Sequence, residues 1–209
     1  MSPEFGMFPL STVLFPGAGL PLHVFEDRYR ALMAHCLAAD LEFGVVLIVR
    51  GSEVGGGDER TDVGTVAAIA NVAELDGGRL LVVATGVRRV RVDAWLPDDP
   101  YPRAVVADLP DGPCGDATGA LAVAETSVRR LRSLLSELGD VPALPHNLRI
   151  TGGPTAVGWQ LCDMAPLTAL DLQRLLAAED LHRRMELLAE LCDAMAGDVL
   201  GLLAGDPGV

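Results

Sequence analysis

The stretch that decides the fold is residues 63–92, which read VGTVAAIANVAEL, then DGG, then RLLVVATGVRRVRV. The runs 63–75 and 80–92 are dominated by valine, alanine and leucine, and each is long enough for a strand. Between them lie Asp76, Gly77 and Gly78, a tight-turn signal because glycine easily enters the positive-φ region that hairpin turns require. We therefore predict a long β-hairpin.

Shorter β-type runs surround this hairpin. Pro16 and Gly17 form a turn signal between the first two of them, and Pro21 within the second indicates an edge or strand-start position, because proline cannot donate to a central ladder. Residues 26–39 change to helical spacing, and residues 51–62, with three consecutive glycines and four acids, read as a flexible solvated loop. The β-type runs are residues 13–15, 19–25, 43–49 and 102–109. The part of the chain before residue 111 is therefore predicted to form a small, closed or half-closed β-barrel with one short helix.

After residue 111 the spacing becomes helical. Residues 121–138, 155–163 and 168–178 are each predicted as a helix, with Thr168 as the N-cap of the third. We expect an α+β protein with a barrel subdomain over residues 8–111, a linker over 112–120 and a helical bundle over 121–209. Residues 1–7 are interpreted as a tag or a disordered start.

The last segment carries the most regular apolar pattern of the chain. Its apolar residues alternate by four and three over three repeats: Leu181, Met185, Leu188, Cys192, Met195, Val199 and Leu202. Additional leucines widen this stripe, which favours a core helix of a bundle over a narrow two-stranded seam. A weak homodimer through the same helix is the alternative.

The charge balance excludes several function classes. The chain carries 16 cationic residues against 29 acids, a net charge of −13, and every cation is an arginine. Without lysine there is no P-loop, no Schiff-base chemistry and no Ser–Lys dyad. The acidic balance also argues against sequence-independent nucleic-acid binding, which depends on clustered cations. Arg88, Arg89 and Arg91 cluster in a strand-like run, and because side chains alternate along a strand, ion pairs with nearby acids are favoured over an anion site.

No motif for catalysis, a cofactor or a metal is found. No serine lies in a nucleophile elbow, and the GxG at Gly17 and Gly19 lacks the third glycine of a dinucleotide site. His35 and Cys36 are adjacent, so on a helix they point about 100° apart and do not face one catalytic point. No secretory signal or membrane-spanning run is present, and scattered cysteines without a CxxC pair indicate a reduced, cytoplasmic protein.

Several blocks of the sequence, in one order, resemble a known family. The first runs through FPLSTVLFPG (8–17), LPLHVFE (20–26) and RYRAL (28–32); later blocks are FGVVL (43–47), GTVA (64–67), GRLLVVATGVRRVRV (78–92) and LLAAEDLHRRM (175–185). Together they resemble the N-terminal, substrate-binding domain of Lon proteases over residues 8–203. The resemblance implies a PUA-like β-barrel followed by a helical bundle, and a free-standing recognition module without the ATPase and peptidase parts.

Two functions from different classes follow. The first is a non-catalytic module that binds unfolded or partly folded protein segments with exposed apolar residues, as an adaptor or regulator of proteolysis. Under this hypothesis the candidate partner-binding residues are Pro21, His23, Phe25, Arg28, Tyr29 and Arg89, for which a purely structural role is the simpler interpretation. The second is nucleic-acid or nucleotide binding, because PUA-like barrels elsewhere bind RNA; the charge weighs against it.

Overall fold

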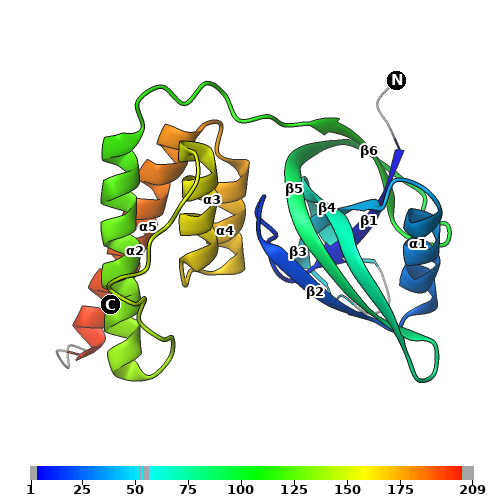
Figure 1. Cartoon of the computed structure of the whole chain (residues 1–209), viewed down its shortest axis with the longest axis horizontal. Helices are drawn as coiled ribbons and strands as arrows, with labels where there is room; N and C mark the ends of the chain where they lie inside the picture. The colour runs from blue at the N-terminus through cyan, green and yellow to red at the C-terminus, as the bar shows by residue number, and fades with distance from the viewer. Residues whose placement is uncertain (1–3, 52, 54–56, 204–209) are drawn as a thin grey trace. The chain divides into compact units, whose positions relative to one another are not determined.

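The chain is α+β, as expected, with strands and helices segregated along the sequence. In the computed structural model, residues 4–51, 53 and 57–203 are described, and the chain divides into two compact units, Met1–Pro110 and Asp111–Val209. The first unit holds the sheet and the second the helices other than α1 (Figure 1). The boundary falls next to the composition change at residue 111.

The first unit is built on one mixed sheet. In its described part the strand order is β2-β5-β4-β3-β1-β6, with an additional β5–β6 pairing that joins β6 back to β5. The β1–β3 pair is parallel and the other pairs are antiparallel. Its elements are β1 (Glu4–Leu10), β2 (Gly19–Val24), α1 (Asp27–Ala38), β3 (Glu42–Arg50), β4 (Glu59–Leu75), β5 (Arg79–Leu96) and β6 (Arg103–Asp108).

The predicted hairpin is confirmed as the pair β4–β5. Its turn residues Gly77 and Gly78 have φ values of 76° and 70°, a region that is strained for other residues. The two strands are 17 and 18 residues long, and they curve together (Figure 1). Register shifts between Val66 and Ala67 and between Ile69 and Asn71 interrupt their ladder, and such irregularities increase the local bend of a strand.

Residues 13–15 do not form the strand that their apolar side chains predict. They belong to an irregular loop, residues 11–18, between β1 and β2. The loop is held by other hydrogen bonds: the buried Thr65 hydroxyl donates to the Leu14 carbonyl at 2.6 Å, and the Gly17 amide donates to the Gly86 carbonyl at 2.8 Å. Leu14 and Phe15 are nonetheless buried, so the apolar run indicates burial and not pairing with another strand.

Two glycines let backbone segments of the first unit pack closely, one against this loop and one between β3 and β4. A Cβ built on Gly86 would lie 2.3 Å from the Phe15 carbonyl oxygen, and one on Gly64 would lie 2.3 Å from the Val45 carbonyl oxygen. Real Cβ atoms essentially never come so close to backbone, so each position requires glycine. Gly86 therefore sets the spacing between the loop and β5, and Gly64 sets the spacing between β4 and β3.

Other boundaries differ from the predictions in smaller ways. Residues 4–6, interpreted as part of a tag or a disordered start, pair with β6 as the first residues of β1. The predicted loop 51–62 ends earlier, because β4 begins at Glu59; residues 52 and 54–56 of that loop lie outside the described residues. Likewise α2 begins at Thr118, within the predicted linker 112–120.

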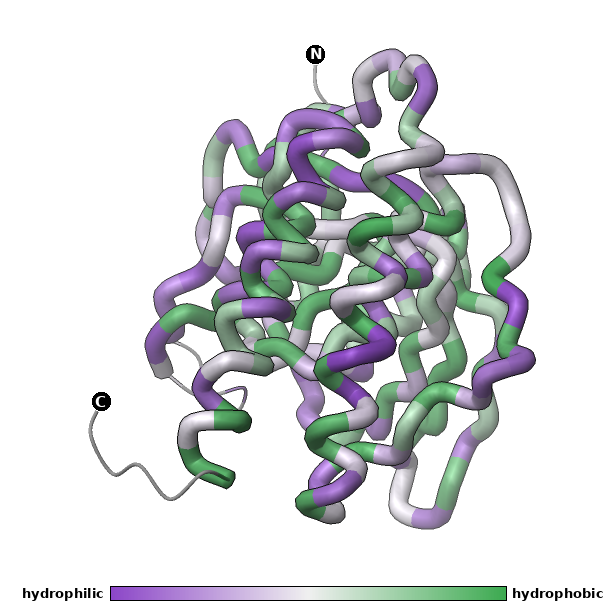
Figure 2. Tube along the Cα trace, turned by 90° about the vertical axis from the view of Figure 1, so that its left-hand side faces the viewer, coloured by the Kyte–Doolittle hydropathy of each residue, from purple (hydrophilic) through white to green (hydrophobic). Residues whose placement is uncertain are grey.

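The second unit is a set of four helices in its described part: α2 (Thr118–Leu138), α3 (Pro154–Met164), α4 (Ala169–Ala177) and α5 (Leu181–Leu203). Thr168 is the N-cap of α4, as predicted, and its hydroxyl accepts a hydrogen bond from the Asp171 amide. Apolar and polar residues alternate along the turns of the trace (Figure 2). No helix among the described residues is long and apolar enough to cross a membrane.

The predicted seam on α5 lies mostly in the core of this unit. Five of its seven residues are buried, whereas Met195 is half-buried and Leu202 is 74% exposed. The partner of the seam is α2, which is joined to α5 by an ion pair between Arg130 and Asp193. The core-helix interpretation is therefore confirmed for most of the seam, and the homodimer stays a prediction.

A fully buried arginine connects the parts of the helical unit. The Arg184 guanidinium lies 3.5 Å from the centre of the Trp159 ring of α3, and it forms an ion pair with Asp111, the first residue of the unit. It also donates to the carbonyl oxygens of Leu175 and Ala178 at the end of α4. The Arg184 side chain of α5 thus contacts α3, the end of α4 and the segment by which the chain enters this unit.

We expect Gly86→Ala to destabilise the first unit by about 2 kcal/mol, because the added methyl group must displace the Phe15 carbonyl. Urea unfolding followed by circular dichroism measures the change. The matched control is Gly19→Ala, where nothing lies within 4 Å of the new Cβ. Equal stability of the two variants would contradict the close approach.

We also expect Arg184→Met to lower the free energy of unfolding by about 3 kcal/mol, since it removes a buried ion pair and the hydrogen bonds to the Leu175 and Ala178 carbonyls. Arg183→Met, at the neighbouring and half-exposed position, should change it by less than about 0.5 kcal/mol. The measurement is urea unfolding monitored by the fluorescence of Trp159. Similar losses in both variants would mean that the buried arginine does not connect the unit.

Candidate functional site

The first unit contains a groove of about 380 Å³ beside β2. Most of its lining is apolar, and seven consecutive residues of it come from β2 and the entry to α1. The lining residues are Phe8, Leu10, Thr12, residues 20–26, Tyr29 and Glu53. The loop 11–18 and the residues that hold it therefore position this groove, because the loop leads directly into β2.

The alternation of β2 divides its side chains between core and surface. Leu20, Leu22 and Val24 are buried, whereas Pro21 and His23 between them are exposed. Phe25, just after the strand, is 54% exposed although it is aromatic. An exposed aromatic ring at the border of an apolar groove is typical of a binding surface.

Two stacked aromatic rings form the floor of the groove. The rings of Phe8 and Tyr29 lie 4.0 Å apart, nearly parallel, and the Arg28 guanidinium lies 4.4 Å from the centre of the Tyr29 ring. Burial raises the pKa of Tyr29 to about 12, more than the charge of Arg28 lowers it. The phenol therefore stays protonated at neutral pH and is a neutral surface for apolar contact.

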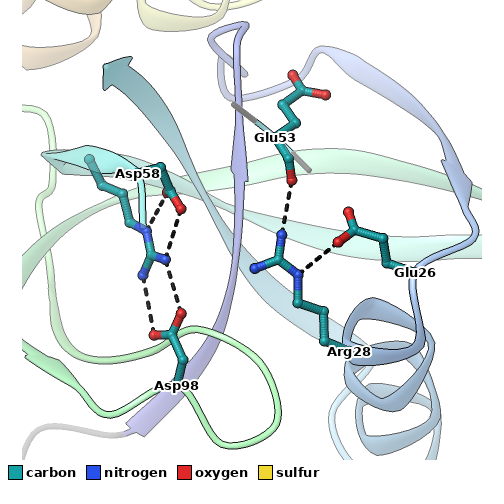
Figure 3. Close-up of polar contacts among 6 residues, drawn as sticks. Glu26, Arg28, Glu53, Asp58 and Asp98 are labelled. Atoms are coloured by element: carbon teal, nitrogen blue, oxygen red, sulfur yellow. Dashed lines mark hydrogen bonds and ion pairs between the residues drawn. The ribbon is translucent and has the colours of Figure 1, made fainter. Parts of the chain in front are cut away.

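Arg28 connects two segments of the groove's rim by hydrogen bonds. Its guanidinium donates to the Glu26 carboxylate at 3.0 Å and to the Glu53 carbonyl at 3.0 Å (Figure 3). The Glu53 carboxylate in turn accepts hydrogen bonds from the amide and the hydroxyl of Ser11. The start of α1, the loop before β2 and residue 53 are thus held together at this end of the groove.

A second arginine forms a neighbouring cluster. Arg60 of β4 pairs with Asp58 at 2.6 Å and with Asp98 at 3.1 Å, and its guanidinium lies 4.9 Å from the centre of the Trp95 ring (Figure 3). Burial alone would raise the pKa of Asp58, but the hydrogen bonds and the charge of Arg60 outweigh it and hold this pKa below its usual value. Asp58 is therefore ionised and paired at neutral pH.

The structure brings five of the six candidate partner-binding residues together. Pro21, His23, Phe25 and Tyr29 line the groove, and Arg28 holds its rim. Arg89 is not part of this site: it is 3% exposed and donates to the Pro110 carbonyl, so it is not presented to a partner.

Sequence reasoning missed the contributions from distant segments. Phe8, Leu10 and Thr12 belong to β1 and the following loop, and Glu53 lies more than 25 residues beyond β2. None of them carries a local signal that would assign it to the site. Tertiary packing brings them to β2: Phe8 and Leu10 share a core cluster with the buried side chains of β2, and Glu53 contacts Ser11.

The arginine cluster of β5 is engaged elsewhere. Arg88 pairs with Glu42 and Asp108, and Arg91 pairs with Asp93. The ion pairs predicted for this cluster are confirmed at these two positions. Phosphate binding would have to break them, so the structure adds no support for the nucleic-acid alternative.

The described cysteine, histidine and acidic side chains give no sign of a catalytic or metal site. Cys36 is buried, and its burial raises its pKa to about 11, so its thiol is not a nucleophile at neutral pH. Its neighbour His35 is exposed and approaches the edge of the Tyr101 ring. Within the part of the chain that the structure describes, no three His, Cys, Asp or Glu side chains are grouped as metal ligands.

Comparison with known proteins places this chain in a family. The family described as the ATP-dependent protease La (LON) substrate-binding domain matches residues 4–194, nearly the whole chain. The chain belongs to the Lon substrate-binding domain family. The resemblance seen in the sequence is thereby confirmed, and what is matched is a substrate-binding domain and neither an ATPase nor a peptidase domain.

The relatives are Lon proteases that are much longer than this chain. A Lon protease 2 of Myxococcus xanthus is 27% identical over 184 residues, which cover 87% of this chain and 22% of that protein. A Lon protease 2 of Sorangium cellulosum is 28% identical over 97% of this chain and 26% of its own length. The chain thus spans about a quarter or less of the Lon proteases it matches.

Solved structures agree with the fold. A Lon N-terminal domain protein from Xanthomonas campestris is 29% identical, with a TM-score of 0.65 over 90% of this chain and 98% of that one. The N-terminal domain of Lon protease from the Mycobacterium avium complex also has a TM-score of 0.65, over 91% of this chain and 98% of that one, at 18% identity. The second comparison supports the fold alone.

The Asp58–Arg60 pair predicts an acid dependence of stability. A carboxyl whose pKa is lowered by folding stabilises the protein above its unfolded pKa of about 3.9, and this contribution is lost as the pH falls through the lower folded value. Asp58→Asn should therefore be less stable than the wild type at pH 7, and the difference should shrink below about pH 4. Urea unfolding at several pH values measures it.

Asp62→Asn, at an exposed position of the same strand, is the control and should change the stability at pH 7 by less than Asp58→Asn does. If Asp58→Asn showed the same stability difference at pH 3 and pH 7, the ion pair would not account for the lowered pKa.

Proposed function

We propose that the groove beside β2 binds apolar segments exposed by unfolded or partly folded protein chains. The observation that carries this proposal is a mostly apolar groove of about 380 Å³, bordered by the exposed Phe25, in a chain of the Lon substrate-binding domain family. The family match supports a substrate-recognition module. The apolar segment as ligand, and the groove as its site, are our inference.

The groove is suited to contact with apolar groups. Burial of apolar surface contributes roughly 25 cal/mol per Å², so covering the exposed ring of Phe25 contributes to the affinity of a complex. The floor of Phe8 and Tyr29 is uncharged, and Arg28 already has its partners in Glu26 and Glu53. A neutral side chain can therefore enter without breaking an ion pair of the floor.

The role in proteolysis is a further part of the proposal. The relatives are named Lon proteases, and the segment they share with this chain is the substrate-binding domain. A module that holds unfolded chains fits an adaptor or a regulator that presents them to a protease. A protease or adaptor is therefore the second partner that we propose, beside the unfolded client.

A binding titration tests the groove. The probe is a reduced, alkylated and permanently unfolded protein carrying a fluorescent dye, and its anisotropy is followed as the chain is added. Phe25→Ser should weaken binding about tenfold, because it removes the exposed ring at the border of the groove.

Val87→Ser is the matched control: Val87 is similarly exposed, at 47%, and lies on β5 outside the groove lining. It should bind as the wild type does. Equal weakening by the two substitutions, or no binding by the wild type, would overturn the proposal.

A further inference from the structure

Strand β2 has one free edge. In the described part of the chain it pairs with β5 and with no other strand. The Gly86 amide donates to the Ala18 carbonyl at 2.9 Å, and because antiparallel bonds alternate, residues 20, 22 and 24 direct their backbone groups toward β5. Gly19, Pro21 and His23 therefore direct theirs away from the sheet, where the missing N–H of Pro21 removes no ladder bond.

The groove follows this edge. Its lining includes every residue from Leu20 to Glu26, of which Leu20, Leu22 and Val24 are buried and Pro21, His23 and Phe25 are exposed. A cavity over one face of a strand would contact alternate residues, because successive side chains point to opposite faces. A cavity that contacts consecutive residues lies beside the backbone, next to the carbonyl groups of Pro21 and His23 and the amide of His23.

The two carboxylates at the α1 end of the groove, Glu26 and Glu53, have different kinds of partner. Glu26 is matched by Arg28, whereas the Glu53 carboxylate accepts from the amide and hydroxyl of Ser11, which are neutral donors. Among the described residues no cationic side chain forms an ion pair with Glu53. The first unit as a whole has nine arginines against fifteen acids, so its field also favours a cationic ligand.

We propose that the occupant of the groove is an extended protein segment that adds as a strand to the free edge of β2 and carries a lysine or arginine next to Glu53. Alternate side chains of the segment enter the apolar groove, and its backbone bonds to Pro21 and His23. This mode of recognition takes affinity from main-chain hydrogen bonds and specificity from alternate side chains. The inference rests on the proposed function and names the conformation and charge of its ligand.

N-methylated peptides test the strand addition. The probe is a dye-labelled peptide of eight residues in which leucine and serine alternate and one terminal serine is replaced by lysine. Two versions carry N-methyl groups on either the odd or the even amides, which removes every second donor. In an added strand one set of amides faces β2 and the other faces solvent, so one version should lose about tenfold in affinity and the other should bind as before.

The charge preference is tested with the same peptide. Replacing its lysine by norleucine should weaken binding to the wild type about threefold, and replacing it by glutamate should weaken binding further. Glu53→Gln keeps an oxygen that can accept from Ser11 and should abolish the difference between lysine and norleucine. Glu74→Gln, at an exposed position of β4 outside the groove lining, should keep it.

The outcomes separate this inference from the proposed function. If neither the unfolded client nor any peptide binds, the proposed function fails. If the peptides bind in a way that depends on Phe25, but the two N-methylated versions bind equally or Glu53→Gln keeps the lysine preference, this inference alone is overturned. Dimers of the chain that the peptide dissociates in sedimentation would assign the edge to a second copy and would also overturn it.

Discussion

The structure of the first unit depends on the close approach of the loop 11–18 to the strands β4 and β5. The Thr65 hydroxyl holds the Leu14 carbonyl, and Gly86 leaves room for the carbonyl of Phe15 while its own backbone bonds to Gly17 and Ala18. A hydrogen bond made in a dry interior costs more to lose than one in water, so these contacts fix the loop firmly. The loop in turn sets where β2 begins.

The groove is a consequence of that placement. Because β2 pairs with β5 alone among the described residues, its other edge is left beside the aromatic floor of Phe8 and Tyr29. The polar residues of the site are mostly occupied with holding it together: Arg28 connects Glu26 to residue 53, and Arg60 connects Asp58 to Asp98. What remains accessible in the groove is apolar side chains, His23, the Glu53 carboxylate and the outer edge of β2.

Local signals were sufficient for the elements and for part of the site. The turn at Gly77 and Gly78, the cap at Thr168 and the seam of α5 each follow from a few neighbouring residues, and each was predicted correctly. The strand predicted from the apolar run 13–15 was wrong. These residues are buried in a loop, and the hydrogen bonds of that loop go to residues about 50 and 70 positions away. Arg89 misled for a related reason: spacing along a strand does not tell whether the face that it occupies is covered.

The sequence by itself determined the fold class, the separation of strands from helices and the family, because periodicity, turn residues and ordered motifs depend on residues that are close together in the chain. It also determined that lysine chemistry is absent. Only the tertiary structure decided that Phe8, Phe25 and Glu53 surround one groove, and that β2, in the described part of the chain, pairs along one edge only. The physical reason is that strand pairing and side-chain packing join residues that are far apart in the chain, and no local pattern encodes which strand is left without a neighbour.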